Sequence, residues 1–375
     1  MTTERPCITI HVLGAGKGES IIIHLPDDKW GVVDCYARSL ADSESNPTMH
    51  FLRKQGVGEL EFLCLTHPHA DHYRGMSQLL EEFPIRFFWQ FGGQSANHFK
   101  QMVSYVQHEG ESEARSESIE SADEFLRIFG LLAKKQRQKE IRQRLSRPTI
   151  QLYPVPFDPE AAFQIVGLAP SENQAGIYNS GLGKCFDEEG RFRPRLPYAH
   201  HNRISVALLI VHGRTRIILG GDVEEAGWRD VVTEMGPAHL TPHMVKVSHH
   251  GSKTGYCDGL WRQFADHGKP IAVITSFITR GLPKRGALDH IREHTSKILL
   301  TCMTALRESE LPTGLTPGVF RSRLALLQKM GRLIDENGHA CGRCTLVFDD
   351  QGQCVDMELE PPAVDLSSLA AHPGS

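Results

Sequence analysis

Three histidines and an aspartate stand within one short stretch, at His67, His69, Asp71 and His72. An apolar run, 60–65, precedes them and predicts a buried strand. Imidazole and carboxylate groups suit a borderline divalent metal such as zinc. Because alternate residues of an extended loop face the same way, His67 and His69 can share one ion, while Asp71 and His72 turn towards a second. The spacing predicts a two-metal site, with a histidine-rich surface turn as the alternative.

Two later segments end in the same kinds of side chain. The apolar stretch 217–219 leads through two glycines to Asp222, and the stretch 244–247 leads to the adjacent pair His249 and His250. Glycines at the end of a strand allow close approach of the backbone. An aspartate alone in this position is usually a turn residue, but its place between two histidine clusters favours a metal ligand. We therefore expect the three segments to meet in the folded chain.

In order and spacing these segments resemble the metallo-β-lactamase superfamily and, within it, the hydrolase domain of bacterial competence proteins, which act in DNA uptake. The matching stretches are 16–20, 33–35, 66–72, Asn202 with Ser205, 221–222 and 249–252. The resemblance extends from about Cys7 to Met303 and omits the membrane channel of the competence proteins. It implies an α/β fold of four αββα layers, with the metals at one edge of the sandwich.

The resemblance also implies a role for each ligand. His67 and His69 would bind the first metal, Asp71 and His72 the second, and Asp222 would bridge the two. The cofactors would be two divalent ions, zinc in the first instance and manganese as the alternative.

Two positions stay open in this comparison. One of His249 and His250 would complete the second site while the other would contact substrate, and the sequence does not decide which. Many superfamily members carry a further histidine ligand where this chain has Asn202. His200 and His201 stand beside it and are alternative ligands.

Supporting residues follow from the same motifs. Asp34 resembles a buried aspartate that orients the histidine loop, and Ser205 belongs to a matched stretch. Two cations roughly 3.5–4 Å apart lower the pKa of a bridging water, and Asp71 would accept a hydrogen bond from the resulting hydroxide. Ser252 and Lys253 suit a phosphate oxygen beside the metals. An exposed lysine without a ligand is the alternative for Lys253.

These residues predict a metal-dependent hydrolase, and the resemblance favours phosphodiester bonds of nucleic acid or nucleotides as its substrate. A phosphorylcholine-esterase-like or other small-ester hydrolase is the first alternative. The second is a non-catalytic metal-binding module whose insertion and C-terminal extension contact a protein partner. The fold supports many hydrolytic reactions, so it does not fix the substrate.

The composition is that of an ordinary globular protein, with 375 residues of which 40% are hydrophobic and 23% charged. A formal net charge of −4 gives no global attraction to nucleic acid. Scattered cysteines, no secretory leader and no apolar run near the ~18 residues of a membrane span predict a cytoplasmic protein with reduced thiols and no membrane contact. For the pair Cys341 and Cys344, structural thiols are favoured over a small zinc site.

The hydrolase domain is predicted over residues 1–303, with a helical insertion at about 96–148. Residues 304–360 are expected to form a small C-terminal extension packed on the core, and 361–375 a disordered tail. The basic stretch Lys134–Arg147 is either a contact for single-stranded nucleic acid or, more commonly for such runs, a solvated helix face. Asn173–His201, rich in glycine and proline, predicts an irregular loop over the site.

Overall fold

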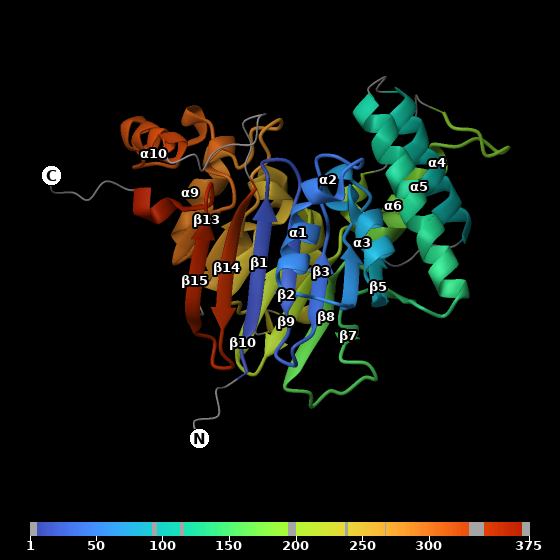
Figure 1. Cartoon of the computed structure of the whole chain (residues 1–375), viewed down its shortest axis with the longest axis horizontal. Coiled ribbons are helices and arrows are strands. Elements are labelled where there is room, and N and C mark those ends of the chain that lie inside the picture. Colours follow the sequence, from blue (N-terminus) through green and yellow to red (C-terminus); the bar gives the residue numbers. More distant parts are fainter. Residues whose placement is uncertain are drawn as a thin grey trace.

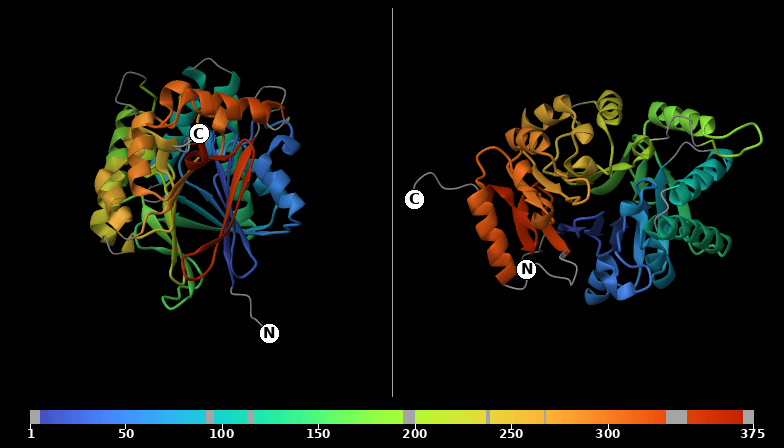
Figure 2. Two further views of the ribbon diagram at one scale, coloured as in Figure 1. Left: turned by 90° about the vertical axis from the view of Figure 1, so that its left-hand side faces the viewer. Right: turned by 90° about the horizontal axis from the view of Figure 1, so that it is seen from above.

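Two β-sheets packed face to face form the centre of the computed structural model, and helices cover their outer faces (Figures 1 and 2). The structure describes residues 6–91, 96–112, 116–193, 200–236, 239–266, 268–329 and 341–369. Seen end-on in Figure 2, the layers follow the order helix, sheet, sheet, helix. The predicted α/β class with αββα layers is therefore confirmed. Among the helices of the described ranges, none has the length and apolar character that a membrane crossing requires.

The first sheet has the strand order β15–β14–β1–β2–β3–β4–β5–β6. Its strands are β1 (Ile8–Gly14), β2 (Ser20–His24), β3 (Trp30–Val33), β4 (Leu60–Leu65), β5 (Ile85–Phe91), β6 (Arg142–Ser146), β14 (Gly342–Phe348) and β15 (Cys354–Glu360). Strands β3 to β6 are parallel to one another. Every residue of β4 is buried, because this central strand is covered on both faces.

The second sheet has the strand order β16–β13–β12–β11–β10–β9–β8–β7. Its strands are β7 (Gln151–Tyr153), β8 (Phe163–Ala169), β9 (Ala207–His212), β10 (Thr215–Leu219), β11 (Met244–Lys246), β12 (Ile271–Ile274), β13 (Lys297–Leu300) and β16 (Val364–Asp365). Strands β10 to β13 are parallel.

Two apolar clusters hold the layers together. The helices are α1 (Pro47–Lys54), α2 (Ala70–Tyr73), α3 (Met76–Glu82), α4 (Ala96–Ser112), α5 (Ser116–Arg137), α6 (Glu172–Lys184), α7 (Glu225–Met235), α8 (Asp258–Asp266), α9 (Arg285–His294) and α10 (Pro317–Lys329). The larger cluster fills the space between the sheets and under α1, α3 and α5. The smaller one joins α7 to α10 to the outer face of the second sheet.

The parallel strands place their C-terminal ends at one edge of the sandwich. The histidine loop follows β4 at this edge, Asp222 follows β10, and His249 and His250 follow β11. Strand β3 ends there just before Asp34. Because parallel strands share one direction, segments far apart in the sequence meet where those strands end.

The structure corrects the expectation of an irregular loop over Asn173–His201. The segment begins with helix α6, since Ser171 caps it by accepting a hydrogen bond from the Gln174 N–H at 3.1 Å. Residues 194–199 of the expected loop lie outside the described residues.

The insertion and the C-terminal tail also differ from expectation. After α4 and α5 the insertion ends in strand β6, so it is not wholly helical. The C-terminal extension supplies β14 and β15 to the first sheet, with β14 paired to β1. In the expected disordered tail, 361–369 contains β16, which pairs with β13, whereas 370–375 lies outside the described residues.

Candidate metal centre

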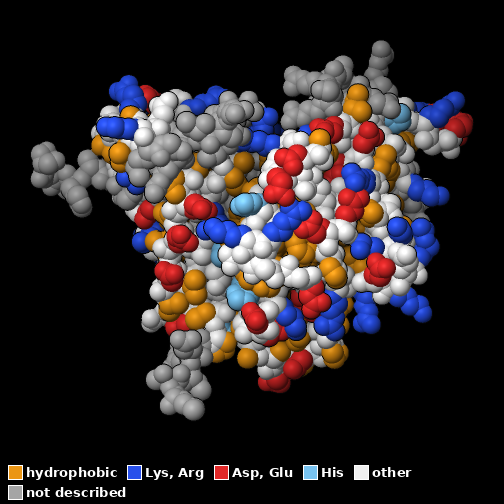
Figure 3. Space-filling model, in the orientation of Figure 1, with side chains coloured by type: hydrophobic (Ala, Val, Ile, Leu, Met, Phe, Trp, Pro, Cys, Tyr) orange, Lys and Arg blue, Asp and Glu red, His pale blue; other side chains and the backbone are white. Residues whose placement is uncertain are grey.

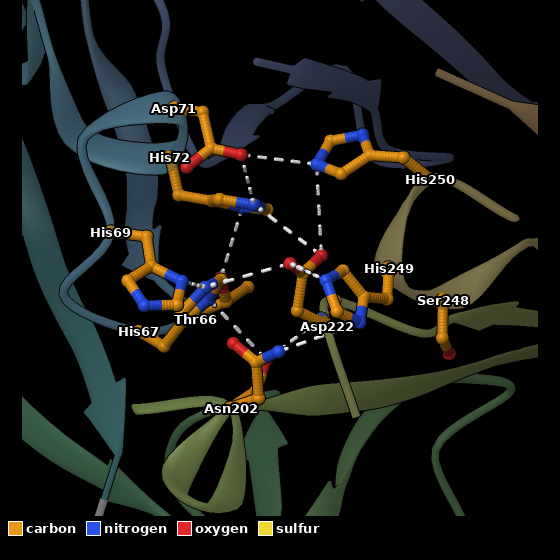
Figure 4. Close-up of polar contacts among 12 residues, drawn as sticks. Thr66, His67, His69, Asp71, His72, Asn202, Asp222, Ser248, His249 and His250 are labelled. Carbon is orange, nitrogen blue, oxygen red and sulfur yellow. Dashed lines mark hydrogen bonds and ion pairs between the residues drawn. The ribbon is translucent and has the colours of Figure 1, made fainter. Parts of the chain in front are cut away.

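Side chains from separate segments converge at the edge where the parallel strands end (Figure 4). The residues brought together are His67, His69, Asp71, His72, Asp222, His249 and His250. The histidine loop passes from extended backbone at His69 into α2, which carries Asp71 and His72. The expectation that three remote segments meet therefore holds in the folded chain.

One group of potential ligands consists of Asp71, His72, Asp222 and His250, whose ligand atoms all lie within 4.8 Å of one another. His72 Nε2 lies 3.4 Å from both Asp71 Oδ2 and Asp222 Oδ1. His250 Nε2 lies 3.1 Å from Asp71 Oδ2 and 3.8 Å from Asp222 Oδ1. Of the two adjacent histidines, His250 is the one in this group.

A second group consists of His67, His69 and Asp222. His67 Nε2 lies 2.9 Å from His69 Nδ1 and 3.7 Å from Asp222 Oδ2. Asp222 thus presents Oδ1 to the first group and Oδ2 to the second. This is the arrangement that a carboxylate bridging two ions requires.

Hydrogen bonds on the far side of two rings point their other nitrogens into the cluster. Asp34 Oδ2 lies 2.7 Å from His72 Nδ1, and the Thr275 carbonyl oxygen lies 2.9 Å from His250 Nδ1. Because each acceptor holds a proton on Nδ1, it directs Nε2 towards the other ligands. Asp34 also accepts hydrogen bonds from the N–H and the hydroxyl of Thr66, at 2.8 and 2.7 Å, which fixes the start of the loop.

The cluster has more buried negative charge than its own ammonium group can balance. Its carboxylates are those of Glu19, Asp34, Asp71 and Asp222. The buried ammonium of Lys246 pairs with Glu19. Burial alone would lower the pKa of His72, but the surrounding carboxylates raise it well above its usual value, so without metal His72 carries a proton. His72 Nε2 and Asp222 Oδ1 are also buried without a hydrogen-bond partner among the described residues. Two divalent cations would satisfy both the charge and these atoms, so the residues fit the predicted metals.

Protonation states in the cluster suit ligation. Burial alone would raise the pKa of Asp222, but the charges of His72 and His250 lower it well below its usual value. The same neighbours lower the pKa of Asp71 against the effect of burial. Burial, foremost, lowers the pKa of His69 to about 3. At pH 7 the two carboxylates are therefore ionised and His69 is neutral, as metal binding requires, whereas His72 would release a proton when a metal binds.

The backbone at the adjacent histidines adopts a rare conformation. The φ angles of His249, His250 and Gly251 are 50°, 53° and 74°, in the left-handed region that residues with a Cβ avoid. Such conformations persist where surrounding contacts fix them, and they gather at functional sites. Here the turn lets both histidines approach Asp222, with His250 Nε2 3.8 Å from Oδ1 and His249 Nε2 3.9 Å from Oδ2.

His249 stands between the ligands and a cavity of about 220 Å³. Its Nδ1 lies 3.0 Å from Thr254 Oγ1, 3.4 Å from Asn202 Nδ2 and 3.7 Å from Glu224 Oε1. These three partners line the cavity. Asn202, predicted at a position where other superfamily members have a ligand, contacts His249 here (Figure 4).

His201 lies behind the cluster and not in either group of ligands. Its ring centroid is 5.2 Å from that of His69, and its Nδ1 lies 2.9 Å from the Tyr178 hydroxyl of α6. Its Nε2 lies 3.6 Å from Glu109 of α4. His200 is exposed. Within the described ranges neither residue joins a potential metal group, so the structure does not support the two alternative ligands.

A buried ion pair beneath the cluster is absent from the sequence prediction. Lys246, the last residue of β11, is fully buried, and its ammonium contacts the Glu19 carboxylate. Glu19 Oε1 lies 3.8 Å from His72 Nδ1, and its Oε2 lies 3.7 Å from His250 Nδ1 and 2.6 Å from Thr275 Oγ1. A lysine in an otherwise apolar strand was the signal that could have revealed this pair.

The remaining predicted residues support the loops. Ser205 Oγ accepts a hydrogen bond from the Asp222 N–H at 2.9 Å, which holds the strand end in place. Ser252 Oγ accepts from the Thr254 N–H at 3.3 Å and so stabilises its own turn. Lys253 is exposed, and a Cβ on Gly286 of α9 would lie 3.7 Å from its Cε. Its side chain therefore lies towards α9.

The cysteines Cys341, Cys344 and Cys354 are free thiols. No group of three potential ligands includes them within the part of the chain that the structure describes. His339, a nearby residue, lies outside that part.

Fold and site together define an αββα sandwich with a histidine–aspartate cluster that could hold two metal ions at one edge. No family model and no curated protein matches the chain. The predicted resemblance to competence hydrolase domains therefore stays a prediction.

Solved structures give similarities at low sequence identity. Tm1679, a metal-dependent hydrolase of the β-lactamase superfamily, aligns over 78% of this chain and 94% of its own, with 13% identity and a TM-score of 0.39. Zinc-bound PqqB from Methylobacterium extorquens aligns over 71% and 89%, with 13% identity and a TM-score of 0.38. The CmlA β-hydroxylase E377D mutant aligns over 72% of this chain and 46% of its own, with 12% identity and a TM-score of 0.35. The function proposed below rests on the site geometry and not on these similarities.

Proposed function

We propose that the chain is a metal-dependent hydrolase of phosphodiester bonds in nucleic acid or nucleotides, with two divalent ions, zinc first, as its cofactors. One observation carries the proposal. Two groups of potential ligands share Asp222, and four carboxylates gather around one buried ammonium. His72 Nε2 and Asp222 Oδ1 are also buried without a hydrogen-bond partner among the described residues. A histidine-rich surface turn would leave its carboxylates in solvent, because burial of unpaired carboxylates costs free energy.

Bound ions would supply Lewis-acid polarisation of a phosphoryl oxygen and would lower the pKa of a water molecule. The chain's own groups supply orientation. Asp34 and Thr275 fix the rings of His72 and His250. The Asp71 carboxylate, ionised at pH 7, can accept a hydrogen bond from the attacking water. His249, between the ligands and the 220 Å³ cavity, is placed to contact substrate.

The cavity supports a nucleotide-like substrate over choline phosphoesters. Its polar lining includes the Asn202 amide and the Glu224 carboxylate, whereas the Gln174 amide already pairs with Asp230 and Arg203. Amide and carboxylate groups can pair with the edges of a base. A quaternary ammonium group is usually held by aromatic rings, and none of the described residues that line the cavity is aromatic.

Metal content measured together with turnover tests the proposal. Wild-type protein loaded with zinc or with manganese is expected to hydrolyse bis-p-nitrophenyl phosphate, and a panel of DNA, RNA, cyclic nucleotides and choline phosphoesters then identifies the substrate. The double variant His69→Ala, Asp71→Ala should lose turnover by roughly a thousandfold or more, since the ligands act as one unit. His200→Ala, at an exposed position outside both ligand groups, is the matched control and should keep its turnover.

Two results would contradict the proposal. Turnover retained in the double variant would show that the cluster does not perform the reaction. Stoichiometric metal without turnover of any phosphoester in the panel would favour the non-catalytic binding module instead.

A further inference from the structure

A groove of about 640 Å³ lies beside the loop that carries His250. It is lined by the side chains of Lys253, Lys284 and Arg285, among others. The groove is joined to the metal centre through the backbone, because the Lys284 N–H donates to the carbonyl oxygen of Gly251, the residue after His250, at 3.2 Å. A ligand bound in the groove would therefore lie next to the candidate metals.

Positive charges crowd together at this groove. A Cβ added at Gly281 would lie 3.1 Å from Arg307 Cζ and 3.3 Å from Lys284 Nζ, so both cations reach the same point. One acidic residue, Glu310, lines the groove, 3.7 Å from Lys284 Nζ. With Lys253 and Arg285 the groove keeps a positive surplus, and like charges held this closely favour a bound polyanion. On the face drawn in Figure 3, Lys and Arg side chains lie along the upper left border, over α10.

An aromatic ring, that of Phe277, lies beside His250, and the Phe277 N–H donates to the carbonyl oxygen of Leu282, which lines the groove, at 3.0 Å. The half-buried Phe277 ring has its centroid 5.2 Å from that of His250, and the Arg280 guanidinium lies 5.6 Å from the Phe277 centroid. Aromatic rings beside basic grooves are the usual means of binding single-stranded nucleic acid, because every base can stack on a ring while the phosphates follow the charges.

Lys134 and Arg137, at the end of α5, lie near the N-terminal ends of the strands, whereas β6 carries the rest of the basic stretch Lys134–Arg147 back towards their C-terminal ends. Strand β6 begins in this stretch and runs parallel to β5 and β4, so its first residue, Arg142, is level with Phe87 in the first half of β5. The histidine loop follows the opposite, C-terminal ends of these strands. Figure 3 shows Lys and Arg side chains at the lower right, over the end of α5. A strand held there would not pass along the metal centre.

We infer that the groove lined by Lys253, Lys284 and Arg285, with Arg307 beside Lys284 and Phe277 beside His250, binds single-stranded nucleic acid that continues from the bond at the metal centre. The phosphates lie over the cations and one base stacks on Phe277. Cleavage of that strand rests on the proposed function, whereas its binding does not and is measured separately.

Fluorescence anisotropy with a short labelled oligothymidylate tests the inference in a series of salt concentrations. The variant Lys284→Gln, Arg307→Gln removes two cations of the groove. For single strands each lost phosphate contact lowers the salt slope by about 0.7, so the slope should fall by about 1.4 and the Kd at about 0.1 M salt should rise roughly 25-fold. Lys134→Gln, Arg137→Gln removes two exposed cations of α5 and is the matched control, with an expected Kd close to that of the wild type.

An abasic strand of the same length separates stacking from charge, and it should bind more weakly than oligothymidylate. Equal affinity of the two double variants, or a larger loss in the α5 variant, would overturn the inference. If the groove double variant unfolds, Arg307→Gln alone, at an exposed position, repeats the test with an expected loss of roughly fivefold. A wild-type protein that binds the strand but does not turn over any phosphoester would contradict the proposed function and would still support strand binding in the groove.

Discussion

The buried pair Glu19 and Lys246 should stabilise the metal centre and the fold together, and a double-mutant cycle measures how strongly. Lys246 is fully buried, with its ammonium against Glu19 and 3.4 Å from the Gly221 carbonyl oxygen. Substituting Lys246→Met leaves the carboxylate buried and uncompensated. Breaking a buried ion pair on one side costs about 3–5 kcal/mol in the free energy of unfolding.

The partner change Glu19→Gln should cost a similar amount, because it leaves the ammonium unpaired. In the double variant Glu19→Gln, Lys246→Met no charge remains at either position, so its loss should be smaller than the sum of the single losses by about 2 kcal/mol or more. Urea unfolding at pH 7, in the presence of a chelator, gives these free energies without a contribution from bound metal.

Metal affinity provides the second measurement in this cycle. Glu19 lies 3.8 Å from His72 Nδ1 and 3.7 Å from His250 Nδ1, so Glu19→Gln alters the charge behind two ligands. Loss of such outer partners typically weakens metal binding 10–100-fold. Two results together would refute the reasoning: single-variant losses in the free energy of unfolding that simply add in the double variant, and an unchanged zinc Kd in Glu19→Gln. They would mean that Glu19 and Lys246 act independently of each other and of the ligands.

Three further outcomes follow from the structure. Asp34→Asn should weaken zinc binding 10–100-fold in a chelator competition, because the proton on His72 Nδ1 loses its ionic acceptor at 2.7 Å; an unchanged Kd would remove Asp34 from the site. Gly18→Ala should lower both the melting temperature and the zinc content, since a Cβ there would lie 2.3 Å from the Asp71 carbonyl oxygen and φ is 67°; wild-type values for both would contradict this close approach. Burial, with Arg343 and His24, lowers the pKa of His11 from 6.5 to about 3. As the pH falls, the unfolded chain therefore binds a proton at this position before the folded chain does. The contribution of neutral His11 to the free energy of unfolding is complete above pH 6.5 and is lost as the pH falls towards 3. Between pH 7 and pH 5 the free energy of unfolding of His11→Gln, measured in urea, should therefore fall by about 2 kcal/mol less than that of the wild type. Parallel pH profiles of the two proteins would exclude this role of His11.

Much of the site could be predicted because its chemistry is local in the sequence. The spacing of the potential ligands between His67 and His72 is visible in the sequence itself. Asp222, His249 and His250 each follow an apolar stretch that predicts a strand, and the structure has a strand at each of these stretches. Parallel strands bring such ends together, so the meeting of these segments follows from strand order. The expectation for residues 361–369 failed because β16 is held by its pairing with β13, a contact that no local pattern reveals.

The sequence alone pointed to the candidate metal-binding residues through local side-chain chemistry and spacing, and the resemblance of their motifs implied the αββα class. Only the tertiary structure places His250, and not His249, in the group with Asp71 and His72, because this placement depends on a left-handed turn and on the Thr275 carbonyl oxygen, 25 residues away in the chain. It also revealed the Glu19–Lys246 pair and the groove at Lys284 and Arg307. Burial and the proximity of charges from distant segments are properties of the packed chain, and they have no signature in the order of the residues.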